Sequence, residues 1–380
     1  MITVIIIIIS TGATMSKVIL ILFASSIFVS SAVSAMSVTF LNPGKQGEHF
    51  WDMVTDTMRA AANDLNIELE IIYAERNRVN MVKLGQSITA RANPPDYLIL
   101  VNEEQSAQSI YLSTEGTNIK TLMLLNDFLP SQRKAVGFPG TNNLIGAITP
   151  DNHSAGRNMM KALHQCSKER SVSTPYHILA IGGDKITPAS IDRNLGAISE
   201  IKAQKNLKLD RFLYANWNSK EAVKLTTHYL EWAKRNGIRP SAIWAANDPI
   251  AFGAKQALEA HNPETVKDVC LVGLNWSALG LKMVKNGDML LTDGGHFLAG
   301  AWSMVMLMDF HHRHSSGSNT VPGNINFQMQ PIDRNNVDQY LKHFGDENWD
   351  KIDFTRFRLT DQQNYDAYDF SLMNIFRQIE

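Results

Sequence analysis

Two consecutive strand–loop–helix units in the second half of the chain constrain its fold more than any other feature. A short apolar run, residues 242–246, ends at Asn247 and Asp248, and apolar residues then recur at helical spacing. A second apolar run, residues 269–274, ends at Asn275. In an open parallel sheet the carboxyl ends of the strands face one crevice, so we expect these polar side chains to meet there.

The same alternation of short strands and amphipathic helices continues on both sides of these units. Helix-spaced apolar residues at 50–65 follow a strand at 38–41 and precede another at 69–73. A second series begins with a strand at 177–181. Because strands and helices alternate with short connections, we predict an α/β fold of two doubly wound parallel sheets with right-handed crossovers.

Residues 1–35 have the composition of an export signal. Lys17 is their only charge, an apolar core follows at 18–29, and small residues occupy 33–35. We therefore expect Met15 to be the functional start and this segment to be cleaved on export to the periplasm. A membrane anchor is the alternative, and the shortness of the apolar core argues against it.

Cleavage would leave 345 residues, a length that suits two lobes. Without Lys17, 35 basic residues balance 37 acidic ones, which gives a net charge of −2. A nearly neutral chain argues against nucleic acid as a partner. We expect Cys166 and Cys270 to be buried free thiols, although export would make a disulfide between them chemically possible.

The order of these strand ends resembles the type I periplasmic binding proteins of the ribose-binding class, which include autoinducer-2 receptor-like members. The resemblance rests on Ala-Asn-Asp at residues 246–248, followed by Val-Gly-Leu-Asn at 272–275, and covers roughly residues 37–310. In that family the second motif usually ends in a carboxylate, whereas here it ends in the amide of Asn275. The resemblance implies two lobes joined by a three-segment hinge.

The family pattern also divides the chain between the lobes. The N-terminal lobe would contain residues 36–150 and 296–328, and the C-terminal lobe residues 151–295 and 329–380. The last fifty residues are longer than in simple sugar-binding relatives and are rich in aromatic residues, which argues against disorder. We expect this tail to pack along the second lobe.

The resemblance implies ligand-binding roles for residues of both lobes. The candidates are Phe50, Trp51, Asn126, Asp127, Arg193, Trp217, Asn247, Asp248, Asn275 and Asp293. Phe50 and Trp51 stand where family members stack aromatic rings on a sugar face, and we expect one ring, preferably Trp51, in the cleft and the other on the core.

Four of these candidates depart from the family or have two interpretations. Asn126 and Asp127 replace the Asp-Arg of ribose-type members, which puts ribose itself in doubt. Arg193 matches a family arginine, but an ion pair with Asp192 or Asp248 is an equal alternative. Trp217 is either a second stacking ring or a packed loop residue.

Other chemistries have little support. The Gly-Gly-Asp at residues 182–184 lacks the further residues of a phosphate-binding loop. His311, His312 and His314 suit a polar helix end better than a metal site, and we expect no cofactor.

The sequence therefore predicts a secreted, non-enzymatic binding protein that closes on a small polar ligand, a sugar or sugar-like signal. It would present this ligand to an ABC permease or to the periplasmic domain of a sensor kinase. A periplasmic enzyme acting on a small carbohydrate is the rival hypothesis, because Asp127, Asp248 and Asp293 could form an acid/base pair.

Overall fold

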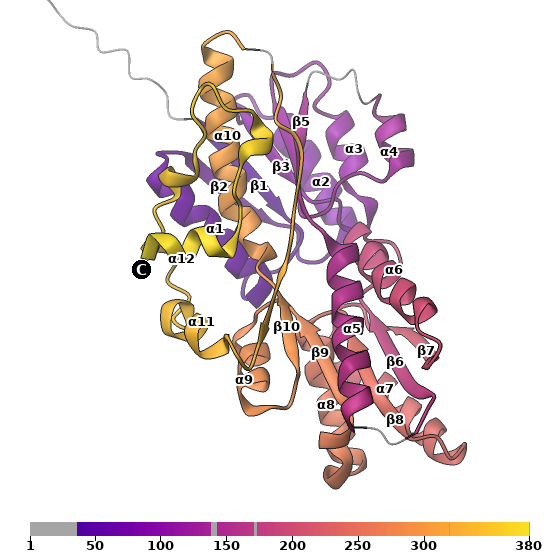
Figure 1. The fold of residues 1–380 in the computed structure, drawn as a ribbon. Coiled ribbons are helices and arrows are strands. Elements are labelled where there is room, and N and C mark those ends of the chain that lie inside the picture. Colours follow the sequence, from indigo (N-terminus) through magenta and orange to yellow (C-terminus); the bar gives the residue numbers. More distant parts are fainter. Residues whose placement is uncertain (1–35, 138–142, 171–172, 319, 380) are drawn as a thin grey trace, which may run out of the picture. The chain divides into compact units, whose positions relative to one another are not determined.

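A computed structural model describes residues 36–137, 143–170, 173–318 and 320–379 of the chain (Figure 1). The predicted export segment, with its expected start at Met15, lies outside these ranges. Within them, no helix combines the length and apolar character needed to cross a membrane.

The first lobe is built on a six-stranded sheet in the order β11-β5-β4-β3-β1-β2, in which every pair is parallel. Its strands are β1 (Ser37–Asn42), β2 (Glu68–Tyr73), β3 (Tyr97–Leu100), β4 (Lys120–Leu124), β5 (Leu144–Pro150) and β11 (Gly323–Phe327). Its helices are α1 (His49–Asp64), α2 (Arg78–Thr89), α3 (Ala107–Leu112), α4 (Pro130–Ala135) and α10 (Ala299–Ser315).

Alternate side chains of this sheet enter two separate cores. Val38 and Phe40 of β1 belong to the core beneath α1 and α10, whereas Leu41 belongs to the core beneath α2 and α3. Both faces are therefore covered, as apolar parallel strands require.

The second lobe repeats this plan with the order β12-β10-β9-β8-β6-β7, and only the pair of β10 with β12 is antiparallel. Its strands are β6 (Tyr176–Gly182), β7 (Leu207–Tyr214), β8 (Pro240–Ala245), β9 (Cys270–Leu274), β10 (Leu291–Gly294) and β12 (Gln330–Asp333). Its helices are α5 (Asn152–Arg170), α6 (Pro188–Ala203), α7 (Ser219–Arg235), α8 (Asp248–His261) and α9 (Ala278–Asn286). The predicted pair of doubly wound sheets is confirmed.

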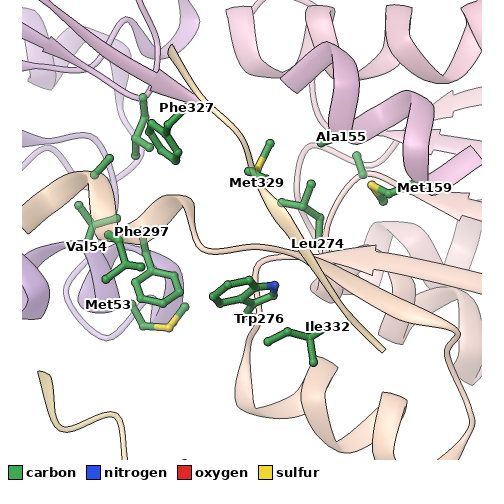
Figure 2. Packing of buried hydrophobic residues seen from close by; sticks show 14 of the residues in the cluster. Met53, Val54, Ala155, Met159, Leu274, Trp276, Phe297, Phe327, Met329 and Ile332 are labelled. Atoms are coloured by element: carbon green, nitrogen blue, oxygen red, sulfur yellow. The ribbon is translucent and has the colours of Figure 1, made fainter. Parts of the chain in front are cut away.

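The chain passes between the sheets three times: after β5, after β10, and from β11 to β12. Apolar side chains continue the core across these passages. Figure 2 shows Phe297 after β10 beside Trp276 after β9, with Phe327 and Met329 along the third passage. The Trp276 and Phe297 ring centres are 6.1 Å apart.

The tail divides between the lobes, whereas the sequence pattern placed all of it on the second. Its start does lie there, because β12 pairs with β10 and α11 (Val337–Phe344) contacts α9. From Trp349 onward it instead packs against α1 and α10 of the first lobe, and α12 (Leu372–Ile379) ends the described chain (Figure 1).

A buried carboxylate explains why the tail returns to the first lobe. Asp309 of α10 is 2% exposed and accepts hydrogen bonds from Arg358 Nε, Leu359 N–H and Tyr368 Oη at 2.8–2.9 Å. A buried charge needs such partners, and the tail supplies them. Nearby, Phe370 stacks on Trp302 with ring centres 4.7 Å apart.

The second lobe also contains a disulfide. Cys166 of α5 and Cys270 of β9 are bonded, with their Cα atoms 6.2 Å apart. The expectation of two free thiols was therefore wrong. The two cysteines are 104 residues apart in the chain, and only the packing of α5 over β9 brings them together.

Candidate functional site

A cavity of about 150 Å³ lies between the carboxyl ends of the two sheets. Seven of the ten predicted site residues line it: Phe50, Trp51, Asn126, Arg193, Trp217, Asn247 and Asn275. A space of this volume admits a single small ring.

The two amides of the second lobe occupy neighbouring strand ends. Asn247 caps α8, and its Oδ1 accepts a hydrogen bond from Ile250 N–H at 2.9 Å. Asn275 has a φ of 144°, and its N–H donates to Asp293 O at 2.8 Å. The first turn of α8 therefore holds the Asn247 side chain, β10 holds the Asn275 backbone, and both residues line the cavity.

Backbone strain concentrates around this cavity. Eleven non-glycine residues in the described part of the chain have positive φ, and nine of them fall in five loops that follow strands. These nine are Glu75, Arg76, Glu104, Gln105, Leu125, Asn216, Trp217, Asn275 and Trp276. Each such residue costs about 1–3 kcal/mol, and clusters of them are typical of ligand sites.

Arg193 is buried at the cavity wall and is held by uncharged acceptors. Its Nε and Nη2 donate to Asn152 Oδ1 at 3.2 and 2.6 Å, and its Nη1 donates to Ala246 O at 2.6 Å. In the described part of the chain these bonds replace the ion pairs with Asp192 or Asp248 that were the alternative. Burial lowers the pKa of Arg193 to about 10 despite the nearby charge of Asp293.

Trp217 lies beneath this guanidinium, whose central carbon is 5.8 Å from a ring centre. Its Nε1 donates to Asp184 Oδ2 at 2.7 Å, so the ring edge is fixed. A Cβ on Gly183 would approach the ring to 2.3 Å, which explains a glycine there. The Gly-Gly-Asp motif thus positions a tryptophan at the cavity.

The first lobe presents a similar pair, Trp51 and Arg76. The Arg76 guanidinium carbon is 5.8 Å from a Trp51 ring centre, but this arginine is held by carboxylates. Its Nε and Nη2 donate to Glu48, the former at 3.0 Å, and its Nη1 donates to Glu103 at 2.6 Å. Burial raises the pKa of Glu103 to about 7, although Arg76 opposes this shift.

Asn126 connects the lobes across the mouth of the cavity. Its Oδ1 accepts a hydrogen bond from Ala189 N–H of α6 at 2.8 Å. Two further bonds join the turn after β3 to the residues just before α6: Glu104 N–H donates to Thr187 Oγ1 at 3.3 Å, and Gln105 Nε2 donates to Ile186 O at 3.2 Å. The lobes are thus in direct contact at this edge.

Three predicted carboxylates do not line the cavity. Asp127 pairs with Arg133. Asp248 is buried and accepts hydrogen bonds from Ser277 and Thr292 at 2.8–3.0 Å, so it ties three strand ends together. Asp293 accepts a hydrogen bond from Gly294 N–H at 2.8 Å. Their competing partners turn these side chains away, so the acid/base pair of the enzyme hypothesis does not form at the cavity wall.

Burial also shifts Asp248 and Asp293 toward the neutral form. It raises the pKa of both Asp248 and Asp293 to about 6, and the hydrogen bonds that each carboxylate accepts oppose the shift only in part.

Several cavity residues escaped the sequence analysis. They include Glu48, His49, Arg76, Glu103, Leu125, Asn152, Thr187, Ser277 and His296. Arg76 follows the end of β2, so the same strand-end rule could have identified it. No local pattern marks His296, which follows two glycines, Gly294 at the end of β10 and Gly295 after it.

The histidines at the end of α10 have other contacts. His311 Nδ1 lies 3.0 Å from Tyr97 Oη, and the His314 ring stacks on Phe310. Among the described residues, no three acidic, histidine or cysteine side chains converge as a metal site would require.

Comparisons with known proteins agree with this architecture. A family model described as a periplasmic binding protein domain matches residues 38–310. No curated protein matches the chain. A crystal structure of a periplasmic sugar-binding protein from Pseudomonas fluorescens is 28% identical, with a TM-score of 0.79 over 90% of this chain and 100% of that one.

Two more distant structures share the fold. One is the binding protein of an arabinose ABC transporter from Shewanella sp. ANA-3, at 19% identity and a TM-score of 0.69, covering 82% of this chain and 97% of that one. The other is an ABC transporter solute-binding protein from Actinobacillus succinogenes 130z with bound D-allose. It has 19% identity and a TM-score of 0.69, covering 80% of this chain and all of that one.

Proposed function

The chain belongs to the periplasmic binding protein family, and from that premise we propose that it binds one uncharged, hydroxyl-rich ring in the cavity between its lobes. The observation that carries this proposal is the composition of the cavity wall, where aromatic rings, amides and a guanidinium converge from both lobes. Aromatic faces suit the apolar C–H surface of a sugar, and amides and guanidinium groups suit its hydroxyls.

The charges at the cavity favour an uncharged ligand. Arg76 is neutralised by two carboxylates, and Asp293 lies close to Arg193. His49 Nε2 is 2.8 Å from Glu347 Oε1, which raises the pKa of His49 through their hydrogen bond. An acidic sugar would add a further negative charge near Glu48, Glu103 and Asp293, and its desolvation would be costly.

The relatives support a sugar and an importer. The Shewanella protein, a component of an arabinose ABC transporter, has arabinofuranose bound, and the Actinobacillus protein has D-allose bound. We infer that this protein delivers a sugar or sugar-like molecule to an ABC permease in the periplasm after cleavage of residues 1–35. Docking onto a sensor kinase remains the second output, and the long aromatic tail is the feature that favours it.

Closure would occur by rotation of two lobes about the three passages between the sheets. We assign residues 36–150 and 296–328 to one lobe and 151–295 and 329–380 to the other, with the end of the tail packed back on the first. Ligand contacts from both lobes would favour the closed arrangement.

Binding is tested with the mature protein and calorimetry against uncharged sugars, polyols and sugar acids. Ala189→Phe would fill the cavity and is expected to abolish binding. Ala203→Phe is the matched control, because this residue is exposed on the same helix. Binding that survives in Ala189→Phe, or a preference for sugar acids, would contradict the proposal.

Closure and chemistry need separate measurements. Small-angle scattering should show a more compact particle with the bound sugar than without it. Mass spectrometry should recover that sugar unchanged. A consumed sugar would instead favour the periplasmic enzyme, and identical scattering profiles would contradict the hinge.

A further inference from the structure

Two polar ring atoms at the cavity have no hydrogen-bond partner within the described part of the chain: Trp51 Nε1 and His296 Nδ1. Both residues line the cavity, and they are only 3% and 5% exposed. Almost all buried polar atoms in folded proteins are paired, because an unpaired one destabilises the fold. Their location indicates that a ligand supplies the missing partners.

The location of these two atoms is distinctive. The other unpartnered buried side-chain atoms in the described residues belong to Asn42, Thr121, His164, Ser167, Asn194, Thr226 and Tyr365. None of these residues lines the cavity. Among the described residues, only Trp51 and His296 therefore combine an unmet hydrogen bond with a place on the cavity wall.

His296 occupies the passage between β10 and α10, at the start of the turn η3 (His296–Leu298). Its ring stacks on Phe50 with centres 4.6 Å apart and planes inclined by 28°, which fixes its orientation. Burial, aided by the charge of Arg193, holds its pKa well below the ordinary value. The imidazole is therefore neutral, with one N–H donor and one acceptor nitrogen.

Neighbouring side chains pack against the Trp51 ring and fix its orientation, so the Nε1–H on the ring edge is the group that can select a ligand atom. A Cβ on Gly44 would come within 2.3 Å of the indole, Phe50 meets it at a T-shaped angle, and Arg76 lies over it. Indole Nε1–H is a donor only, so its partner in the cavity must be an acceptor.

We propose that Trp51 Nε1 and His296 Nδ1 bind hydroxyl groups of the ligand, and that His296 is a ligand-binding residue located on a passage between the lobes. This inference rests on the proposed function. A hydroxyl accepts from Trp51 and can either donate to or accept from His296, whichever ring nitrogen carries the proton. The passage itself thus contributes a ligand contact, in addition to those of the two lobes.

The test uses Trp51→Phe and His296→Phe, which remove the nitrogen and keep an aromatic ring. Calorimetry with myo-inositol, D-allose, L-arabinose and D-galactose first identifies a binder for the wild type. Affinity for that compound should fall by roughly 5- to 150-fold in each variant. His296→Asn, which restores a polar atom near the position of Nδ1, should recover part of the loss.

Stability without sugar separates a binding role from a structural one. The Tm of His296→Phe should equal or exceed that of the wild type, because an unpaired buried atom is removed. Trp51→Phe should lower Tm less than Trp244→Phe does, because both lose ring volume but only Trp244 also loses a hydrogen bond. Trp244→Phe is the control for Trp51, because its Nε1 donates to Gly156 O at 3.3 Å, and it should lower Tm without changing affinity. His164→Phe, outside the cavity, should leave affinity unchanged.

The outcomes are distinguishable. A wild type that binds a sugar while His296→Phe binds it equally well overturns this inference and leaves the proposed function intact. A loss of Tm in both cavity variants as large as that of Trp244→Phe also overturns it. A wild type that binds none of the four compounds overturns the proposed function and this inference together.

Discussion

The two lobes share a strand order, and each places an arginine over a tryptophan at the cavity. The distance is 5.8 Å in both, for Arg76 over Trp51 and for Arg193 over Trp217. The members of the pair are exchanged between equivalent elements. In the first lobe the tryptophan is on α1, the helix after strand β1, and the arginine follows β2. In the second lobe the arginine is on α6, the helix after strand β6, and the tryptophan follows β7. Shared topology thus places the pair, while the sequence decides which element carries which residue.

The partners of the two arginines differ, and this difference separates their roles. Arg76 is saturated by two carboxylates of its own lobe, and although burial lowers its pKa, these partners raise it overall. Arg193 bonds to an amide and a carbonyl oxygen, which do not neutralise it. Arg76 therefore acts mainly as a clamp between loops, whereas Arg193 keeps charge and donors for the cavity.

The largest expected effect tests the second lobe, which alone contains the disulfide. Cys166→Ala combined with Cys270→Ala should lower the free energy of unfolding by about 4–5 kcal/mol, because the bond closes a loop of roughly 100 residues. Calorimetry should show the second lobe unfolding before the first, and the wild type with reductant should behave alike. One transition at the wild-type Tm would show that the lobes do not differ in this way.

Arg193→Met should weaken sugar binding by about 2–5 kcal/mol, roughly 30- to 5,000-fold, because buried acceptors and the ligand lose their donor together. Isothermal calorimetry measures the change. Arg211→Met is the matched control, since Arg211 lies 3.9 Å over Trp232 but outside the cavity. If both variants lost affinity equally, the hypothesis that Arg193 provides its charge and donors to the ligand would be contradicted.

Glu103→Gln tests the first-lobe arginine and its carboxylate partners through the pH dependence of stability. Glu103 has a raised pKa of about 7, so the folded chain holds a proton that the unfolded chain releases above pH about 4.5. Its contribution to the free energy of unfolding therefore falls as pH rises from about 4.5 to about 7, by at most about 3 kcal/mol. In urea unfolding, the free energy of unfolding of the variant should rise relative to that of the wild type between pH about 4.5 and about 7.

The control for this pH experiment is Glu115→Gln, at an exposed position of the same lobe. Its stability should follow that of the wild type at every pH. Parallel curves for Glu103→Gln and the wild type would mean that Glu103 stays ionised and that Arg76 is paired with two charges throughout.

The smallest effect concerns the amides of the second lobe. Asn247→Ala or Asn275→Ala should reduce sugar affinity by about 1–3 kcal/mol, roughly 5- to 150-fold, because hydroxyls in a dry cavity lose a partner. Asn262→Ala, after the end of α8, is a control away from the cavity. Unchanged calorimetric affinity in both cavity variants, with folding intact, would place the ligand elsewhere.

The sequence by itself determined the architecture and the edge at which the site lies. Apolar runs alternating with helical periodicity require parallel, doubly wound sheets, and the carboxyl ends of such strands share one side. Asn126, Asn247 and Asn275 could be placed there because each follows its strand directly. This inference needs only local covalent geometry and the direction of the strands.

Tertiary structure alone decided which polar side chains reach the cavity. Asp248 comes directly after Asn247 at the same strand end, yet Ser277 at the start of α9 and Thr292 of β10 bind it and turn it inward. The clamp on Arg76, the disulfide and the return of the tail to Asp309 likewise join residues far apart in the chain. Such choices depend on competing partners that meet only when the loops fold, and no spacing in the sequence encodes them.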